Sequence, residues 1–244
     1  MRLPPISWHD TLDSTNARAK DLAKAGTVTD IWIAARQQTA GRGRLGRSWI
    51  SPEGNLFATA LISVPGGVDH AMRLPFAAAL AVHDVLAVAA PSADFRLKWP
   101  NDVRCNAAKI SGILVETGAG NSGDWAAVGI GINIASAPDG AAQEAACLAE
   151  YLNGPAPTPE ELLPDLVNAF QARKMEAWRD FAATRKDWCD RAEALNQQVR
   201  VRIGARDLEG CFAGLSDDGG LILEGAEGAQ EIVRAGDVQL VSRA

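Results

Sequence analysis

The sequence has 244 residues, of which 47% are hydrophobic and 22% are charged, as in an ordinary soluble globular protein. Its formal net charge of −6 argues against a general nucleic-acid binder, because affinity for the phosphate backbone comes mainly from surplus lysine and arginine. The amino terminus lacks the features of a signal peptide, and no apolar stretch uninterrupted by charge reaches about 18 residues, the length of a membrane span. We therefore expect a cytoplasmic protein, with one large and one small domain, that binds neither membrane nor nucleic acid.

Helix and strand signals alternate along the first part of the chain. Residues 13–26 begin with cap-type residues and end at a glycine, which predicts a helix. Segments 30–37 and 54–64 have the composition of strands. Residues 73–90, with Pro75 near their start and apolar residues at helical spacing, predict a largely buried helix.

The second part of the chain changes character near residue 194. Three apolar segments come first, and we expect them to be strands of one sheet: residues 94–100, 107–119 and 124–135. Thr158 with Glu161 forms a capping-box sequence, which predicts one or two helices that run to about residue 194. Residues 198–241 are short alternating runs punctuated by glycines, which predicts a small all-β barrel.

Cysteine and histidine spacing excludes several kinds of site. The sequence has no Cys-x-x-Cys pair and no histidine close to a cysteine, so neither a zinc site nor a redox motif is predicted, and we expect reduced cysteines. The three scattered histidines and the absence of a Gly-x-Ser-x-Gly sequence argue against a Ser-His-Asp hydrolase. No metal site is expected from a protein motif alone.

A basic loop interrupts this acidic sequence. Residues 31–52 contain no aspartate or glutamate and four arginines, which are Arg36, Arg42, Arg44 and Arg47. Arginine presents a planar fork of donors to phosphate or carboxylate, and the interleaved glycines let backbone N–H groups approach the same anion. The pattern is neither a Walker A loop nor a Rossmann fingerprint. A solvated surface hairpin, or an RNA-binding Arg-Gly segment, is the alternative.

A second polar stretch, KWPNDVRCNAAKISGILVE, begins at Lys98. Asn101 and Asp102 are common turn residues, so a simple turn explains them as well. However, Lys98 and Lys109 flank a turn with few charge partners, and Lys109 precedes a glycine-containing strand. This arrangement suits an anionic group held against the backbone.

Five motifs in this order resemble the biotin protein ligases. They are DSTN at 13–16, QTAGRGRLGRSW at 38–49, KWPND at 98–102, KISGILVE at 109–116 and GIGINI at 129–134. The resemblance implies an α+β fold, with a class II aminoacyl-tRNA synthetase-like catalytic domain (a mixed sheet with flanking helices) over residues 1–194. It also implies an SH3-like β-barrel over residues 195–244.

The resemblance also implies a two-step reaction. MgATP would activate biotin to biotinyl-5′-AMP with release of pyrophosphate, and the biotinyl group would pass to one lysine of a biotin carboxyl carrier domain of acetyl-CoA carboxylase or a related carboxylase. Both steps gather negative charge, so the protein must neutralise it and hold the reactants in line. The basic loop is expected to be mobile when empty and to order over the adenylate, because a mixed anhydride must be shielded from water.

Individual roles follow from motif positions only. Catalytic positions would be Lys109, Arg42 and Arg44. Biotin-binding positions would be Ser14, Thr15, Asn16, Gln38, Arg42, Gly43, Arg44, Lys109, Gly112, Gly129 and Gly131. Positions around ATP and Mg²⁺ would be Arg44, Trp49, Lys98, Asn101, Asp102 and Asn133. Helix capping by the DSTN residues and a core role for Trp49 are simpler alternatives.

Other functions stay open on the sequence alone. A lipoate or octanoate ligase shares the adenylate and acyl-lysine chemistry, and a biotin-binding sensor without turnover would use the same anion-binding loop. About a dozen residues precede DSTN, too few for the DNA-binding domain of the repressor-type relatives, so operator binding is not expected. An exposed sheet edge would allow a homodimer, although no self-complementary patch stands out.

Overall fold

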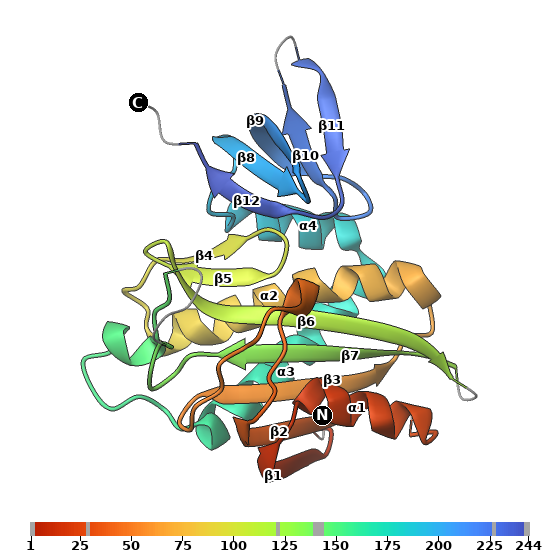
Figure 1. Ribbon diagram of the computed structural model, residues 1–244, viewed down its shortest axis with the longest axis vertical. Helices are drawn as coiled ribbons and strands as arrows, with labels where there is room; N and C mark the ends of the chain where they lie inside the picture. Colours follow the sequence, from red (N-terminus) through yellow and green to blue (C-terminus); the bar gives the residue numbers. More distant parts are fainter. Residues whose placement is uncertain (1–2, 28–29, 121–122, 139–143, 226–227, 242–244) are drawn as a thin grey trace.

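The computed structural model describes residues 3–27, 30–120, 123–138, 144–225 and 228–241, which form two sheets with flanking helices. The larger sheet has the strand order β1-β2-β3-β7-β6-β5-β4, and only its β1–β2 pair is parallel. Figure 1 shows this mixed sheet below the smaller one. The strands are β1 (Ile6–Leu12), β2 (Ile31–Gln38), β3 (Leu56–Ser63), β4 (Phe95–Lys98), β5 (Asp102–Cys105), β6 (Ala108–Gly120) and β7 (Gly123–Ile132).

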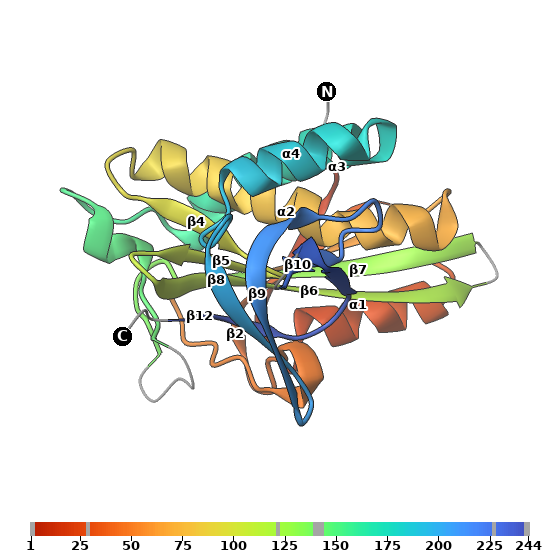
Figure 2. The ribbon, with the colours of Figure 1, turned by 90° about the horizontal axis from the view of Figure 1, so that it is seen from above.

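The two faces of the larger sheet carry different layers. Helices α2 (Gly67–Ala89) and α3 (Pro159–Arg179) cover one face, whereas α1 (Thr15–Lys24) and the basic loop lie on the other (Figure 2). Successive side chains of a strand point to opposite faces. On β7, Val128 therefore belongs to the core beneath α2, and the flanking Gly129 falls on the α1 face. The same alternation places small residues beneath the basic loop.

Helix α2 begins earlier than the sequence suggested. It starts at Gly67 rather than near Arg73, so Pro75 lies inside the helix and not in its first turn. The extra turns bring Ala71 into the core, where it is 9% exposed. By length and composition α2 could cross a membrane, but 61% of its most apolar window is buried, as expected of a core helix.

Most other expected elements are confirmed, and two strands were missed. The helix within residues 13–26 is α1, and the two helices after Thr158 are α3 and α4 (Phe181–Asp190). The capping box forms, because Thr158 Oγ1 accepts from the Glu161 N–H and a Glu161 carboxylate oxygen accepts from the Thr158 N–H. Strands β1 and β5 were not expected, because β1 contains polar residues and β5 has only four residues. Short 3-10 helices are η1 (Arg44–Gly46) and η2 (Leu148–Tyr151).

The smaller sheet is antiparallel, with the strand order β11-β10-β9-β8-β12. Its strands are β8 (Gln198–Ile203), β9 (Arg206–Leu215), β10 (Leu221–Glu224), β11 (Gln230–Val233) and β12 (Asp237–Leu240). It packs on the larger unit, because the Phe212 ring lies 6.4 Å from that of Trp188 on α4, and Trp99 Nε1 donates to the Gly219 carbonyl over 3.1 Å. One hydrophobic core therefore runs through both sheets.

Candidate active site

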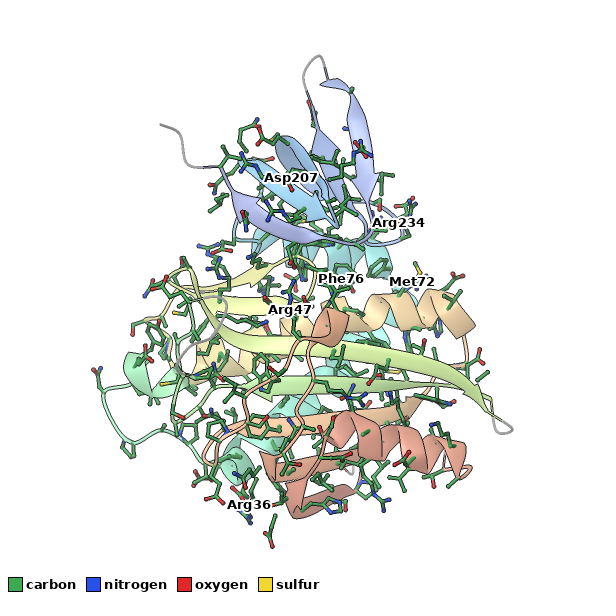
Figure 3. All side chains as sticks on the ribbon, viewed as in Figure 1. Arg36, Arg47, Met72, Phe76, Asp207 and Arg234 are labelled. Carbon is green, nitrogen blue, oxygen red and sulfur yellow. The ribbon has the colours of Figure 1, made fainter. Side chains whose placement is uncertain are left out.

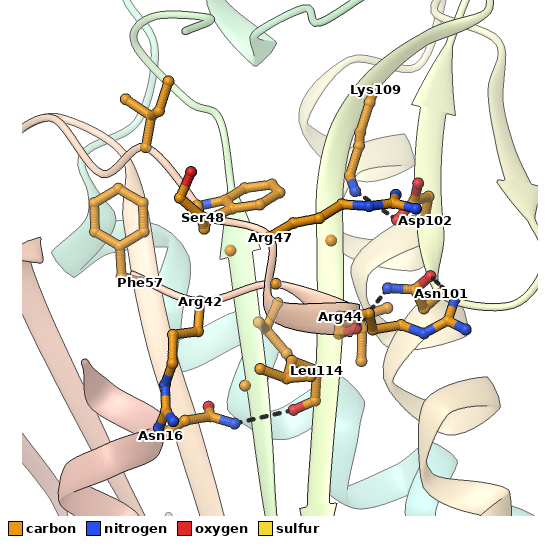
Figure 4. A pocket seen from close by; sticks show the side chains of 18 of the residues that line it. Asn16, Arg42, Arg44, Arg47, Ser48, Phe57, Asn101, Asp102, Lys109 and Leu114 are labelled. Carbon is orange, nitrogen blue, oxygen red and sulfur yellow. Dashed lines mark hydrogen bonds and ion pairs between the residues drawn. The ribbon is translucent and has the colours of Figure 1, made fainter. Parts of the chain in front are cut away.

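A cavity of about 440 Å³ opens on the α1 face of the larger sheet, beneath the basic loop. Its walls come from the start of α1, the end of β2, the loop, β3, the β4–β5 turn, β6, β7 and the segment after it, and one residue of β12. Figure 4 shows Asn16 and Lys109 on opposite sides of the cavity, with Arg44 and Arg47 of the loop between them. Arg42 extends toward Asn16 and lies 3.8 Å from Glu116, whereas Arg44, Arg47 and Lys109 form a cationic end on the other side.

The Asn16 end of the cavity contains a network of short polar side chains. Gln38 Oε1 accepts from the Thr15 N–H at 2.9 Å, and Gln38 Nε2 donates to Ser51 Oγ at 3.0 Å. Thr59 of β3 is fully buried, and its Oγ1 lies 2.8 Å from Thr15 Oγ1 and 2.7 Å from Asn16 Oδ1. Fixed donors and acceptors of this kind suit a neutral polar ring of a ligand.

Asn16 is held in place from three sides. Its Oδ1 faces Thr59, while its Nδ2 donates to the Leu114 carbonyl at 3.2 Å and to Glu116 Oε2 at 3.0 Å. Lys20 Nζ binds the other Glu116 oxygen at 2.6 Å. Burial opposes ionisation of Glu116, but hydrogen bonds from Lys20 and Asn16 outweigh it and lower the pKa of this carboxyl. A Cβ at Gly129 would collide with Asn16 Oδ1, so a larger residue there would displace the asparagine.

Trp49 forms part of the cavity wall and rests on two glycines. A Cβ at Gly112 would lie 2.8 Å from the Trp49 ring, and a Cβ at Gly131 would lie 2.6 Å from it. The side chain of Lys109 also faces this ring, with Nζ 5.3 Å from the ring centroid. The glycines therefore let the indole lie flat against β6 and β7, beside the cationic end.

Four basic and two acidic side chains line the cavity as a whole. The basic residues lining the cavity are Arg42, Arg44, Arg47 and Lys109, and the acidic ones are Asp102 and Asp237. Lys109 Nζ lies 2.7 Å from Asp102 Oδ1. Burial lowers the pKa of Arg44, and the carboxylates of Asp237 and Asp102 counteract this effect. An arginine keeps its charge under such shifts, so the cavity has a formal surplus of two positive charges in an acidic protein.

The basic loop is a short hairpin with anchored arginines. Backbone bonds from the Gly43 N–H to the Arg47 carbonyl (2.7 Å) and from the Trp49 N–H to the Gly41 carbonyl (2.9 Å) close it. Arg44 Nη1 donates to Asn101 Oδ1 at 2.9 Å, which ties the loop to the β4–β5 turn. Leu45, at the tip, has a left-handed φ of 56°. The ordering of this loop over a ligand stays a prediction.

The structure brings together every residue singled out for biotin or ATP except Lys98. Lys98 ends β4, the edge strand of the larger sheet, and lines a separate cavity of about 230 Å³ that faces the smaller sheet. Its register partner on β5, Asp102, does line the main cavity. Lys98 therefore does not line the main cavity, and its place around the nucleotide stays a prediction.

Several lining residues were not singled out in the sequence. Arg47 was part of the basic loop, but no role was assigned to it. Phe57 could have been found from the alternation of β3, since it lies two residues before Thr59 on the same face. Asp237 carries no local signal, because only the packing of the smaller sheet brings it to the cavity.

Comparison with known sequences places the chain in a family of acyl-group ligases. The family described as "Biotin/lipoate A/B protein ligase family" matches residues 8–133, and the chain belongs to this family. A second match, to "Biotin protein ligase C terminal domain", covers residues 194–241. The two matches together select the biotin branch of the family.

Whole-length relatives agree with these matches. A biotin–(acetyl-CoA-carboxylase) ligase of Paracoccus denitrificans is 42% identical over 232 residues, which are 91% of this chain and 95% of the relative. The ligase of the same name from Mycobacterium tuberculosis is 34% identical over 237 residues, covering 92% and 85% of the two chains. The structure of the Aquifex aeolicus biotin protein ligase, in complex with biotin and ATP, superimposes with a TM-score of 0.82 at 28% identity and covers 98% of this chain and 99% of that one.

Proposed function

We propose that the protein is a biotin protein ligase, which adenylates biotin with MgATP and transfers the biotinyl group to a lysine of a biotin carboxyl carrier domain. The observation that carries this proposal is the distribution of polar and charged groups in the cavity beneath the basic loop. A network of hydrogen-bonding side chains lies at one end, where Arg42 also extends toward Asn16, and Arg44, Arg47 and Lys109 lie at the other. Biotin has the matching polarity, with a neutral ureido ring at one end and a carboxylate at the other.

The first step joins the biotin carboxylate to the α-phosphate of ATP and releases pyrophosphate. Two anions must approach each other, so the protein has to offset their repulsion. We assign this task to Arg42, Arg44 and Lys109, which line the cavity. Thr15, Asn16 and Gln38 would hold the ureido ring, so that the carboxylate points toward these cations.

The second step consumes the mixed anhydride. The neutral amine of the carrier lysine attacks the biotinyl carbonyl carbon, an amide bond forms, and the bond to the phosphate breaks with release of AMP. Trp49 packed on Gly112 and Gly131 would cover the adenylate and limit access of water. The proton lost by the amine leaves with solvent or phosphate.

Mg²⁺ is expected to arrive with ATP. Among the described residues, no group of three or more His, Cys, Asp or Glu side chains is arranged to hold a metal ion. Magnesium commonly takes one or two protein oxygens together with phosphates and water. The Asp102 carboxylate fits this requirement, and so does buried Asn133 Oδ1, which has no hydrogen-bond partner in the described part of the chain. Bound there, the ion would reduce the charge of the triphosphate.

The finer assignments of fold, location and partners belong to the same proposal. Residues 1–194 would form a class II aminoacyl-tRNA synthetase-like domain, and residues 195–244 an SH3-like barrel, a division supported by the two separate sheets. The protein would act in the cytoplasm and would not bind nucleic acid, in keeping with its net charge of −6. A homodimer would use an exposed sheet edge. The natural acceptor would be the carrier of acetyl-CoA carboxylase.

Carrier labelling tests the proposed function. The protein, biotin and MgATP are incubated with a purified biotin carboxyl carrier domain, and intact mass spectrometry follows the carrier. We expect one biotinyl group per carrier, and none on a carrier whose acceptor lysine is replaced by arginine. Binding of biotin without any labelling of the carrier would instead favour a sensor, and labelling with lipoate alone would favour the lipoate branch.

A further inference from the structure

A carboxylate of the smaller sheet lies in the cavity proposed for anionic ligands. Asp237 is the first residue of β12. Among the described residues that line the cavity, it is the one that belongs to the smaller sheet. Its carboxylate forms an ion pair with Arg47 of the basic loop, 190 positions earlier in the chain. A negative group at this position would repel a triphosphate, so its presence requires an explanation.

The two acidic residues of the cavity are bound in different ways. Asp102 is neutralised by Lys109 across the adjacent strands β5 and β6 of one sheet, a rigid setting. Asp237, in contrast, binds a side chain of the loop. The side chains of Arg47 and Asp237 are 47% and 37% exposed, so water and ions can compete for both partners.

Asp237 forms its ion pair with Arg47 and acts on two other cations at longer range. Arg44 donates to the neutral amide of Asn101, which in turn donates to the Ile113 carbonyl at 2.8 Å. Lys98 also lies within the influence of Asp237, since burial lowers the pKa of Lys98 and Asp237 is one of the carboxylates that counteract it. Asp237 thus lies where positive side chains of the loop and of β4 converge. A phosphate group would be stabilised at the same place.

We infer that Asp237 is a positioning residue that holds Arg47 over the cavity when no nucleotide is bound, and that the distal phosphates of ATP replace Asp237 as the partner of Arg47. The inference rests on the proposed function and deepens it. No covalent bond changes in this exchange of ion-pair partners. Asp237 would then weaken ATP binding, because the phosphates must compete with it, and would favour release of pyrophosphate when it pairs with Arg47 again.

The test compares the ATP dependence of biotin-dependent ATP–pyrophosphate exchange in four variants. Asp237→Asn removes the competing charge, and we expect the KM for ATP to fall about two- to fivefold, the range expected for loss of one exposed ion pair. Inhibition by added pyrophosphate should strengthen by a similar factor, while the KM for biotin should stay unchanged. Arg47→Gln should raise the KM for ATP, because it removes the arginine that phosphate would bind.

The double variant and a matched control separate this role from general effects of charge. In the Arg47→Gln background, Asp237→Asn should have no further effect on the KM for ATP. Asp207→Asn makes the same change of charge on β9 of the smaller sheet (Figure 3). Asp207 pairs with Arg202 at 2.9 Å, and its replacement should leave the KM for ATP unchanged. Circular dichroism checks folding, and Asp237→Ser supplies the same loss of charge should the amide variant not fold.

Each outcome either supports or overturns the assigned role of Asp237. A lower KM for ATP that disappears in the Arg47→Gln background supports the inference. An unchanged or higher KM in Asp237→Asn, or an equal effect with and without Arg47, overturns it while leaving the proposed function in place. Absence of biotin-dependent exchange in the unmodified protein overturns both.

Discussion

Lys109 contacts both a carboxylate and an aromatic ring of the cavity. Its Nζ pairs with Asp102 at 2.7 Å and faces the Trp49 ring. The lysine lies on β6, three residues before Gly112, on the strand that forms the floor of the cavity. A cation held at this place is suited to stabilise negative charge that builds up on the reacting carboxylate and phosphate.

Replacement of Lys109 by alanine should therefore lower biotin-dependent ATP–pyrophosphate exchange by about 100-fold or more, the range seen when one stabilising donor is lost. Circular dichroism verifies that the variant is folded at the assay temperature, since buried Asp102 loses its partner. Lys186→Ala serves as the control, because Lys186 is exposed and pairs only with Asp190 on α4. Near-normal exchange in folded Lys109→Ala would remove Lys109 from the mechanism.

Gly131 gives a second prediction at the scale of one residue. In Gly131→Ala the new methyl group would lie 2.6 Å from the Trp49 ring and should push the indole away from β7. Because small displacements of positioning groups are costly, we expect kcat/KM to fall about 10- to 100-fold. Gly154→Ala is the matched control, since nothing lies within 4 Å of its Cβ position. Equal activity of the two variants would show that the position of Trp49 is unimportant.

At the scale of elements, the sequence predicted those helices and strands whose signals lie within one short stretch of chain. The cap at Thr158 and the apolar run of β3 depend on residues close in sequence, so they could be predicted. The early start of α2 could not, because burial of Ala71 under tertiary contacts outweighs the boundary signal of Pro75. The motifs likewise identified most of the cavity, because each lies on one loop or strand end.

Long-range packing explains what was missed. The pairing of Arg47 with Asp237 depends on how the smaller sheet lies against the larger one, and no local pattern encodes that. Lys98 has a recognisable local motif, but packing determines where its side chain lies. Because β4 is an edge strand, the side chain lines a neighbouring cavity.

Helix α1 and strand β6 are linked through Glu116, and this link should depend on pH. Burial opposes ionisation of Glu116, but Lys20 and Asn16 lower its pKa below the ordinary value. Ionised Glu116 therefore stabilises the folded state above the pKa of the unfolded chain, about 4.3, and this contribution is lost as the pH falls through the lower folded-state value.

The variant Glu116→Gln should accordingly lose about 1 kcal/mol of unfolding free energy at pH 7, and this difference from the unmodified protein should shrink below about pH 4. Urea unfolding at several pH values measures it. Glu209→Gln, which removes an exposed partner of Arg200, is expected to have a smaller effect. A difference for Glu116→Gln that stays constant between pH 7 and pH 3.5 would contradict the assigned link.

At the scale of the whole molecule, the two sheets share one hydrophobic core. Phe212 of the smaller sheet is 2% exposed and belongs to the same cluster as Trp188 and the residues beneath α2. A sheet that buries its apolar side against a neighbouring unit is not expected to unfold independently of it. Because the shared core fixes the smaller sheet against the larger one, Asp237 is held close to the basic loop.

Phe212→Ala should therefore destabilise the entire molecule by about 3–5 kcal/mol, the usual cost of truncating a buried phenylalanine. Tryptophan fluorescence and far-ultraviolet circular dichroism should report the same single urea transition. Ile232→Ala on β11, where the side chain is 44% exposed, should change stability little. Two separate transitions would show that the smaller sheet unfolds by itself.

The most direct measurement is ATP–pyrophosphate exchange on the purified protein with biotin, lipoate, octanoate or no acid, run in parallel. The polar network at one end of the cavity and the cations at the other predict exchange with biotin and none above background with the other acids. Exchange with lipoate or octanoate in place of biotin would contradict the assignment of the polar network to a ureido ring. Absence of exchange with every acid would contradict catalysis at this cavity.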